Sequence, residues 1–228
     1  RDRTFDQKSG GMIVKPEEIL KQVAAETAVC QKCALHYSRK NAVAGEGPAN
    51  AEIVFIGEGP GFHENEQGRP FVGAAGKLLD ELLAKIGLKR HQVYITNVVK
   101  CRPPGNRDPQ PDELTACSDY LERQLQAINP RVIVTLGRYS MARFMPNVKI
   151  SDVHGQGMQV RGRLVVPMYH PAAALHQPSL KPMLEHDFLG LPDLIAQTPQ
   201  AHTPETLPLE IEDEKPSSKT EPKQLSLF

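Results

Sequence analysis

Four short apolar runs alternate along the chain with segments whose apolar residues recur at helical spacing. The runs occupy residues 53–56, 93–99, 131–137 and 164–169. Short apolar strands separated by helices are typical of a parallel sheet that is covered on both faces. The pattern therefore predicts an α/β fold with four parallel strands.

The helical segments supply the covering layers. The clearest apolar stripe follows residue 73 and consists of Leu78, Leu79, Leu82, Leu83 and Ile86. Further helices are expected at residues 16–28, 112–129, 139–145 and 181–197. Two stretches are predicted to lack helix: residues 63–67 as a polar, acid-bearing loop, and residues 148–163 as a glycine-punctuated hairpin or loop.

The first apolar run ends abruptly in GEGPG at residues 57–61. Three glycines and a proline within five residues let the backbone turn sharply and approach a ligand closely. Neither G-x-G-x-x-G nor the phosphate-loop pattern is present, which argues against a nucleotide-binding fold. An ordinary strand-to-helix connection is the alternative to a ligand-binding loop.

Polar groups lie at or near the ends of three of the four runs. The glycine loop follows the first, Asn97 lies within the second, and His170 follows the fourth. Ligands of parallel sheets bind beyond the carboxyl ends of the strands. The sequence therefore predicts an active centre where these groups converge.

The composition indicates a single domain followed by a tail. The chain has 228 residues, 39% of them hydrophobic, which suffices for a single core at residues 16–197. Residues 1–15 are expected to be a loose lead-in. Lys plus Arg equal Asp plus Glu at 27 each, but residues 196–228 hold six acids and three bases, which leaves 24 bases and 21 acids in the remainder. That mild excess permits a nucleic-acid partner without requiring one.

The four cysteines indicate a metal centre. Cys30 and Cys33 form C-x2-C, and Cys101 and Cys117 lie far downstream. In a chain without a secretory signal, four thiolates more often bind zinc or an iron–sulfur cluster than form disulfides. The uneven spacing favours a cluster over a zinc ribbon but leaves both open, and scattered core cysteines are the alternative.

Four ordered motifs carry a resemblance: residues 57–61 (GEGPG), 68–73 (GRPFVG), 97–101 (NVVKC) and 170–172 (HPA). Together with the cysteines they resemble the uracil-DNA glycosylase superfamily, and most of all its iron–sulfur branch, family 4. The resemblance implies a three-layer α/β/α fold, a [4Fe–4S] cluster on the four cysteines, and hydrolysis of the bond between uracil and deoxyribose in DNA.

The resemblance also implies roles for the base pocket. Phe71 would stack on a flipped uracil, and Asn97 would read its edge, presenting the wrong groups to cytosine. His170 would stabilise the charge that gathers on the departing base. Taken singly, these residues could equally be a core aromatic, a turn asparagine and a structural histidine.

Two acids and several surface residues complete the predicted site. Glu58 is favoured over Glu64 as the acid that orients water or offsets a cationic sugar. The backbone amides of Gly59 and Gly61 would line the pocket. Predicted DNA contacts are Lys100, Arg102, Arg107 and, as the residue wedged into the duplex, Leu175. Relatives often carry arginine near this last position, and this chain has Leu175-His176 instead. Residues 102–108 contain no histidine, so ordinary turnover is expected rather than crosslinking to DNA.

The tail ends in a recognisable peptide. From residue 198 it is rich in Pro, Glu, Ser, Thr and Lys, a composition typical of a flexible linker. Its last five residues resemble the bacterial sliding-clamp-binding peptide, in which the apolar side chains fill a pocket; they are Gln224, Leu225, Ser226, Leu227 and Phe228. An accidental apolar terminus is the alternative.

The resemblance sets the expected partners. They are uracil-containing DNA and the clamp, with no membrane, and the protein is expected to be a cytoplasmic, nucleoid-associated monomer. Two rival functions stay open. One is a glycosylase of this fold for another deaminated base such as hypoxanthine or xanthine. The other is a non-catalytic iron–sulfur module for DNA binding or electron transfer.

Overall fold

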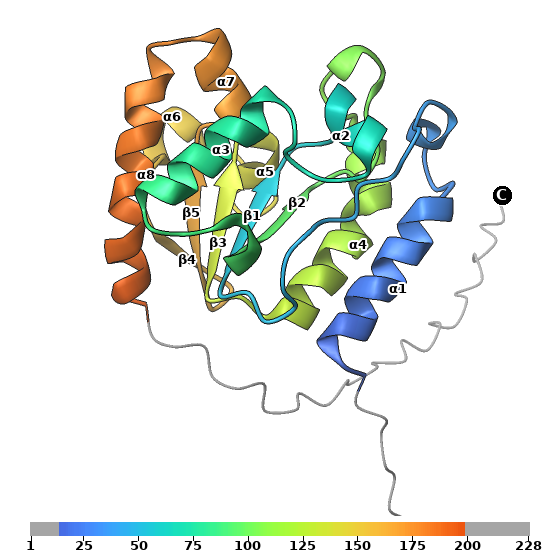
Figure 1. The fold of residues 1–228 in the computed structure, drawn as a ribbon, viewed down its shortest axis with the longest axis horizontal. Coiled ribbons are helices and arrows are strands. Elements are labelled where there is room, and N and C mark those ends of the chain that lie inside the picture. The colour runs from blue at the N-terminus through green and yellow to red at the C-terminus, as the bar shows by residue number, and fades with distance from the viewer. Residues whose placement is uncertain (1–13, 199–228) are drawn as a thin grey trace, which may run out of the picture.

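The structure, a computed structural model, describes residues 14–198 and is built around a five-stranded sheet (Figure 1). Its strands are β1 (Ile53–Gly57), β2 (Tyr94–Asn97), β3 (Val132–Leu136), β4 (Met158–Val160) and β5 (Arg163–Met168). Their order is β2-β1-β3-β5-β4, and every neighbouring pair is parallel except β4 and β5. The register pairs Gly57 with Asn97, so the carboxyl ends of β1 and β2 lie side by side.

The predicted count of four strands is wrong, because β4 adds a fifth. It lies in the stretch predicted as a hairpin or loop, and it pairs with β5 across a turn in which Arg161 and Gly162 have φ of 49° and 76°. Three partly exposed residues are too few to produce a strand signal in the sequence. The four longer strands lie where the apolar runs predict them.

Eight α-helices and three 3₁₀ turns connect the strands within the described residues. The helices are α1 (Pro16–Val29), α2 (Phe62–Gln67), α3 (Ala74–Lys85), α4 (Pro111–Ile128), α5 (Arg138–Ala142), α6 (Ile150–Val153), α7 (Pro171–His176) and α8 (Leu180–Ala196). The 3₁₀ turns are η1 (Ala34–Tyr37), η2 (Arg90–Gln92) and η3 (Pro104–Asn106). Among residues 14–198, no helix combines the length and apolar character needed to cross a membrane.

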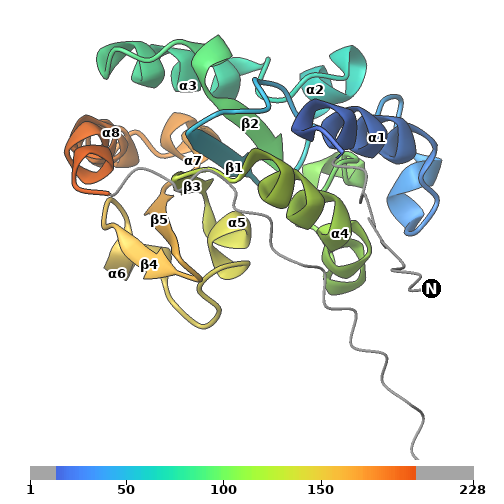
Figure 2. The same cartoon turned by 90° about the horizontal axis from the view of Figure 1, so that it is seen from below.

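Helices cover the two faces of the sheet with separate cores (Figure 2). On one face, Phe55 of β1 packs with the leucines of α3 and with Phe188 of α8, whose ring stacks on Phe55. On the other face, Val54 and Ile56 pack with α4 and α5. Alternate residues of β1 thus serve opposite cores, as expected for a strand buried on both sides.

The N-terminal helix α1 packs along α4 (Figure 1). Arg123 of α4 makes a two-pronged ion pair with Glu26 of α1, with N–O distances of 2.5 and 2.9 Å. A third apolar cluster joins Val23 of α1 to Val99 and Tyr120. This packing places the end of α1, and the cysteines that follow it, beside α4 and the segment after β2.

The prediction of a polar loop at residues 63–67 is wrong, because these residues form part of α2. The helix ends at Gly68, which adopts a left-handed conformation with φ of 69°. Six residues are too short for a helical stripe to be recognised. The predicted lead-in at residues 1–15 and the tail from residue 198, with its terminal peptide, lie almost wholly outside the described residues.

Candidate active site

A cavity of about 400 Å³ opens at the carboxyl ends of β1, β2 and β5. It is lined by the glycine loop after β1, by Phe71 before α3, by Asn97 at the end of β2 and by His170 after β5. Residues of η3 and α7 form its other walls. The strand ends therefore converge on one cavity, as the sequence predicts.

The absence of a side chain at Gly57 lets Asn97 and Phe71, which line this cavity, approach the end of β1. A Cβ atom at that position would collide with Asn97 Oδ1 and lie 2.7 Å from the ring of Phe71. Glycine is therefore needed so that the Asn97 amide and the Phe71 ring can face the same small volume. The part of the cavity that Phe71 and Asn97 border is called the slot.

The Asn97 side chain is buried and incompletely bonded. Its exposed fraction is 1%, and its Oδ1 has no hydrogen-bond partner among the residues that the structure describes. Buried polar atoms are nearly always paired, and because Asn97 lines the cavity, its Oδ1 is available to a ligand there. An amide offers both a donor and an acceptor to such a ligand.

His170 is held in one tautomer. The backbone N–H of Ala172 donates to His170 Nδ1 at 3.0 Å, so the ring proton resides on Nε2. Desolvation by the surrounding protein lowers the pKa of His170 to about 4, although the charge of Glu64 opposes this shift. The histidine is therefore neutral near pH 7 and is a hydrogen-bond donor through Nε2. Its ring stacks on Phe71 with centroids 5.5 Å apart.

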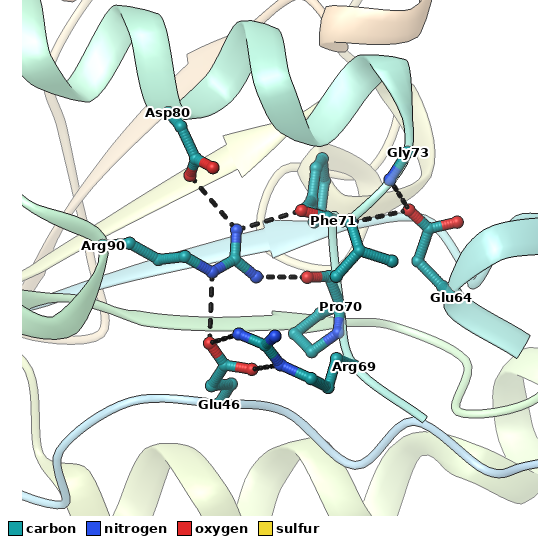
Figure 3. A network of polar contacts seen from close by, with 9 residues as sticks. Glu46, Glu64, Arg69, Pro70, Phe71, Gly73, Asp80 and Arg90 are labelled. Atoms are coloured by element: carbon teal, nitrogen blue, oxygen red, sulfur yellow. Dashed lines mark hydrogen bonds and ion pairs between the residues drawn. The ribbon is translucent and has the colours of Figure 1, made fainter. Parts of the chain in front are cut away.

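Two carboxylates line the cavity, and their surroundings differ. Desolvation raises the pKa of Glu58 to about 6, with the charge of Asp108 adding to the shift and Arg138 opposing it. The Glu58 carboxylate makes no hydrogen bond to the described residues, although the backbone oxygen of Glu58 accepts from the N–H of Val99 at 3.1 Å. Glu64, in contrast, accepts from the N–H groups of Val72 and Gly73 at 2.9 and 3.0 Å (Figure 3). Glu58 is therefore the carboxylate available for chemistry, and Glu64 anchors the segment that carries Phe71.

Comparison with known proteins identifies the family. The family model of the Uracil DNA glycosylase superfamily matches residues 44–189. The type-4 uracil-DNA glycosylase of Sulfurisphaera tokodaii is 50% identical over 196 residues, which cover 81% of this chain and 88% of the relative. The corresponding proteins of Archaeoglobus fulgidus and Thermotoga maritima are 49% and 46% identical, and the matches cover 78% and 72% of this chain and 94% and 86% of the relatives. The chain belongs to the uracil DNA glycosylase superfamily.

Three of the residues predicted to contact DNA lie after β2 and on α7. Arg102 and Arg107 lie on the segment after β2, where Arg102 donates to Asn106 Oδ1 at 2.8 Å and Arg107 forms an ion pair of 2.6 Å with Glu113. Leu175 is 46% exposed on α7. Arg107 lines the cavity, and Arg102 and Leu175 directly precede the lining residues Pro103 and His176. Their contact with DNA stays a prediction.

The prediction that Lys100 contacts DNA is wrong. Its side chain is 1% exposed, and its Nζ donates to Thr96 Oγ1 at 2.6 Å, Gln124 Oε1 at 2.7 Å and the backbone oxygen of Asn97 at 2.9 Å. Burial lowers the pKa of this amine to about 8. Lys100 therefore supports the end of β2 from within, and no phosphate can reach it.

The four cysteines lie together at the end of α1, although they come from three segments of the sequence. All are free thiols, and all line one small cavity beside Arg39. Several donors are directed at the sulfur atoms: the backbone N–H of Lys100 lies 3.3 Å from Cys117 Sγ, and Arg39 Nη1 lies 3.5 Å from Cys101 Sγ. Hydrogen bonds to sulfur are typical of iron–sulfur sites, so the donor set fits the cluster expected for the family's iron–sulfur branch.

The sequence reasoning did not identify Arg90, Glu46 or Gly76. Arg90 binds the segment that carries Phe71, Glu46 binds Arg90, and Gly76 lets α3 approach Phe71 closely. Each lies outside the four motifs. The only signal in the sequence is an arginine just before a predicted strand, and that is indistinguishable from a solvated surface charge.

Proposed function

We propose that the protein excises uracil from DNA by hydrolysing its N-glycosidic bond, which leaves an abasic site for base excision repair. The observation that carries the proposal is the buried, unpaired amide of Asn97 beside Phe71 and a neutral His170. The type-4 uracil-DNA glycosylases at 46–50% identity are named for this activity.

Recognition in this scheme begins with a nucleotide rotated out of the duplex, because a stacked base cannot reach the cavity. The slot beside Gly57 accepts the flat ring, and Phe71 stacks on it. Asn97 bonds the edge that distinguishes uracil from cytosine, since an amide fixed by its surroundings for one base presents the wrong donor and acceptor to the other. The amide of Gly59 lines the opening.

Bond cleavage then separates charge between base and sugar. The electron pair of the N1–C1′ bond moves onto uracil, and Nε2–H of His170 donates to the oxygen where that negative charge gathers. The sugar becomes cationic, and the Glu58 carboxylate stabilises it and orients a water molecule. The water oxygen bonds to C1′, and its proton passes to Glu58, whose pKa of about 6 suits that transfer.

A labelled oligonucleotide with a single uracil tests the proposal. After incubation and alkali treatment, we expect strand scission at that position, and we expect both Asn97→Asp and His170→Ala to remove it. His186→Ala alters an exposed histidine on α8, outside the cavity, and is expected to behave as wild type. Scission only at hypoxanthine or xanthine would replace the proposal with the rival glycosylase. DNA binding without scission at any base would support the non-catalytic module.

We further propose that Cys30, Cys33, Cys101 and Cys117 bind a [4Fe–4S] cluster. The four cysteines line one small cavity, and backbone and arginine N–H groups lie within hydrogen-bond distance of two of their sulfur atoms, which supports this proposal. In such a cluster each cysteine binds a different iron atom. When bound, the cluster would supply a structural link between α1, the segment after β2 and α4. Iron and sulfide analysis with visible absorption spectroscopy tests this proposal.

The finer partner assignments belong to the same proposal. We infer that Arg102 and Arg107 bind phosphates, that Leu175 contacts the duplex at the vacated position, and that residues 224–228 bind the sliding clamp through a linker. Because excision acts on one base in one strand, we infer that the protein is a monomer that acts at the nucleoid in the cytoplasm. Size measurement of the purified protein, alone and with DNA, tests the monomer.

A further inference from the structure

The backbone around Phe71 adopts an uncommon conformation. Phe71 has φ of 51°, in the left-handed region that residues with a Cβ atom rarely occupy. Such a conformation persists only where the surroundings hold it in place. The turn is also tightly packed, because a Cβ atom at Gly76 of α3 would overlap the carbonyl group of Phe71.

Two side chains hold four successive backbone groups of this turn (Figure 3). Arg90 Nη1 donates to the carbonyl oxygen of Phe71 at 3.0 Å, and its Nη2 donates to the carbonyl oxygen of Pro70. Glu64 accepts from the next two N–H groups, as described above. The peptide units on either side of the stacking residue are therefore fixed from opposite directions.

Arg90 is itself fixed by two carboxylates. Its Nε lies 3.1 Å from Glu46 Oε1, and its Nη1 lies 3.2 Å from Asp80 Oδ1 on α3. Glu46 is in turn tied to β2, because its backbone exchanges two hydrogen bonds with Ile95 at 2.8 and 2.9 Å. The Arg90 side chain is 19% exposed, so these charge-assisted bonds are partly shielded from water.

From this geometry we infer that Arg90 is a positioning residue for uracil excision: it fixes the Phe71 turn to β2 and thereby sets the distance between the Phe71 ring and the Asn97 amide. The inference rests on the proposed function for its substrate. It concerns a residue that is not among those lining the cavity. Its effect reaches the substrate through the carbonyl groups of Pro70 and Phe71.

The adjacent Arg69 provides a matched control. It pairs with the same Glu46 at 2.6 and 2.9 Å, but its side chain is 55% exposed and it makes no hydrogen bond to the Phe71 turn. Arg69→Ala therefore removes one arginine from the same carboxylate and leaves the carbonyl groups bonded. Arg90→Lys keeps the charge but lacks the planar fork that binds both carbonyl groups.

The test measures single-turnover excision with enzyme in excess over uracil-containing DNA. We expect Arg90→Ala to lower the rate by up to about 100-fold, the size of effect that a small misplacement of a reacting group can cause. Arg90→Lys should lie between that variant and wild type, and Arg69→Ala should match wild type. Inhibition by free uracil should weaken in Arg90→Ala, and affinity for DNA with a stable abasic site should not change.

A double-mutant comparison separates positioning from general stability. If Arg90 acts through Phe71, then Arg90→Ala has little further effect in a Phe71→Ala background. An Arg90→Ala protein that keeps the wild-type rate, or that loses the same factor in both backgrounds, overturns the inference.

Amide hydrogen exchange gives a readout independent of the substrate. In Arg90→Ala, the amides of Val72 and Gly73 should exchange faster than in Arg69→Ala, and unchanged protection also overturns the inference. Wild-type protein that releases no uracil while Arg90→Ala shows this faster exchange would refute the proposed function and leave the positional role of Arg90 supported.

Discussion

At the scale of single residues, the site depends on charge states that the surrounding protein imposes. The Ala172 N–H group fixes which nitrogen of His170 carries the proton, and desolvation keeps the ring neutral. The neutral His170 ring donates its Nε2–H to the uracil oxygen without any change in its own charge. The pKa of Glu58 is raised, whereas that of His170 is lowered, and the Glu58 carboxyl group becomes charged only near pH 6.

The raised pKa of Glu58 predicts an acid limb in the excision rate. The rate should fall as the pH is lowered through about 6, because protonated Glu58 can neither stabilise a cationic sugar nor accept a proton. His170 stays neutral through this range, since its pKa is about 4. Single-turnover rates between pH 4.5 and 8 measure the limb.

Two substitutions assign this limb. Glu58→Gln should abolish it and lower the rate about 100-fold, a typical loss for a general base. Asp108→Asn should move it to lower pH, because the charge of Asp108 helps to raise the pKa of Glu58 and its contact with Arg138 would be lost. A limb near pH 6 that persists in Glu58→Gln would contradict the assignment.

A second residue-scale prediction concerns Gly57. Gly57→Ala should reduce excision by at least about 100-fold, because its Cβ would displace the Phe71 ring or the Asn97 amide from the slot. Gly190→Ala is the matched control, since a Cβ there meets open space on a helix. Excision assays on both variants, with circular dichroism to verify folding, make the comparison. An active Gly57→Ala protein would show that the slot is not used.

Local sequence predicts some of these residues and not others. Asn97 and His170 stand at the ends of apolar runs, so strand direction alone places them in the cavity. The sequence predicts an exposed Lys100, because the nearby Arg102 and Arg107 suggest a basic surface loop, but the side chain is buried. Its burial depends on Thr96 and Gln124, and only the packing of α4 against β2 brings that glutamine close.

At the scale of elements, segments distant in sequence meet around the cysteines. The pair after α1 lies beside Cys101, which follows β2, and Cys117 on α4. Pro16 and the acids that follow it predict α1, and the apolar spacing of Leu121, Leu125 and Ile128 predicts α4. The sequence pattern does not predict α2, whose residues after Phe62 are all polar, or β4, whose three residues are partly exposed, because neither segment has an apolar period.

Loss of the proposed cluster should loosen these elements selectively. Cys117→Ser, or removal of iron by a chelator, should lower the thermal unfolding midpoint and expose residues 28–40 and 100–110 to proteolysis, because ligand binding contributes to folding where it links separate segments. The sheet is expected to stay protected, since its two cores contain none of the four cysteines.

The matched control for this prediction is Ser118→Ala, which changes a partly exposed neighbour on the same helix. It should melt and resist protease as wild type does. Equal loosening of the sheet and of the cysteine segments would contradict a local structural role. Unchanged melting of a Cys117→Ser protein that lacks iron would do the same.

At the scale of the whole molecule, the strand order sets the position of the site. β1 lies centrally between β2 and β3, so the glycine loop after β1 adjoins both Asn97 and, across β3, the residues after β5. Alternation of strands and helices predicts this parallel arrangement, but it cannot give the order of the strands. The order depends on which helix packs on which face, a property of the complete chain.

The terminal peptide leads to a prediction about the molecule and its partner. Deletion of residues 224–228, which lie outside the described residues, should abolish capture by immobilised sliding clamp and leave excision on short oligonucleotides unchanged. Effective concentration explains the separation, because tethering acts only where the clamp is present. A variant with the same five residues in scrambled order is the control for length and composition. Full capture of the deleted protein would refute clamp binding through this peptide.

The two margins of the sheet bear on how the protein behaves when concentrated. β4 has only three residues and turns directly into β5, and β2 at the opposite margin is met by Glu46 through paired backbone hydrogen bonds at Ile95. Neither margin within residues 14–198 offers a long row of open peptide groups onto which a second chain could add a strand. The strand edges of the described residues therefore leave a second copy of the chain few free peptide groups with which to pair.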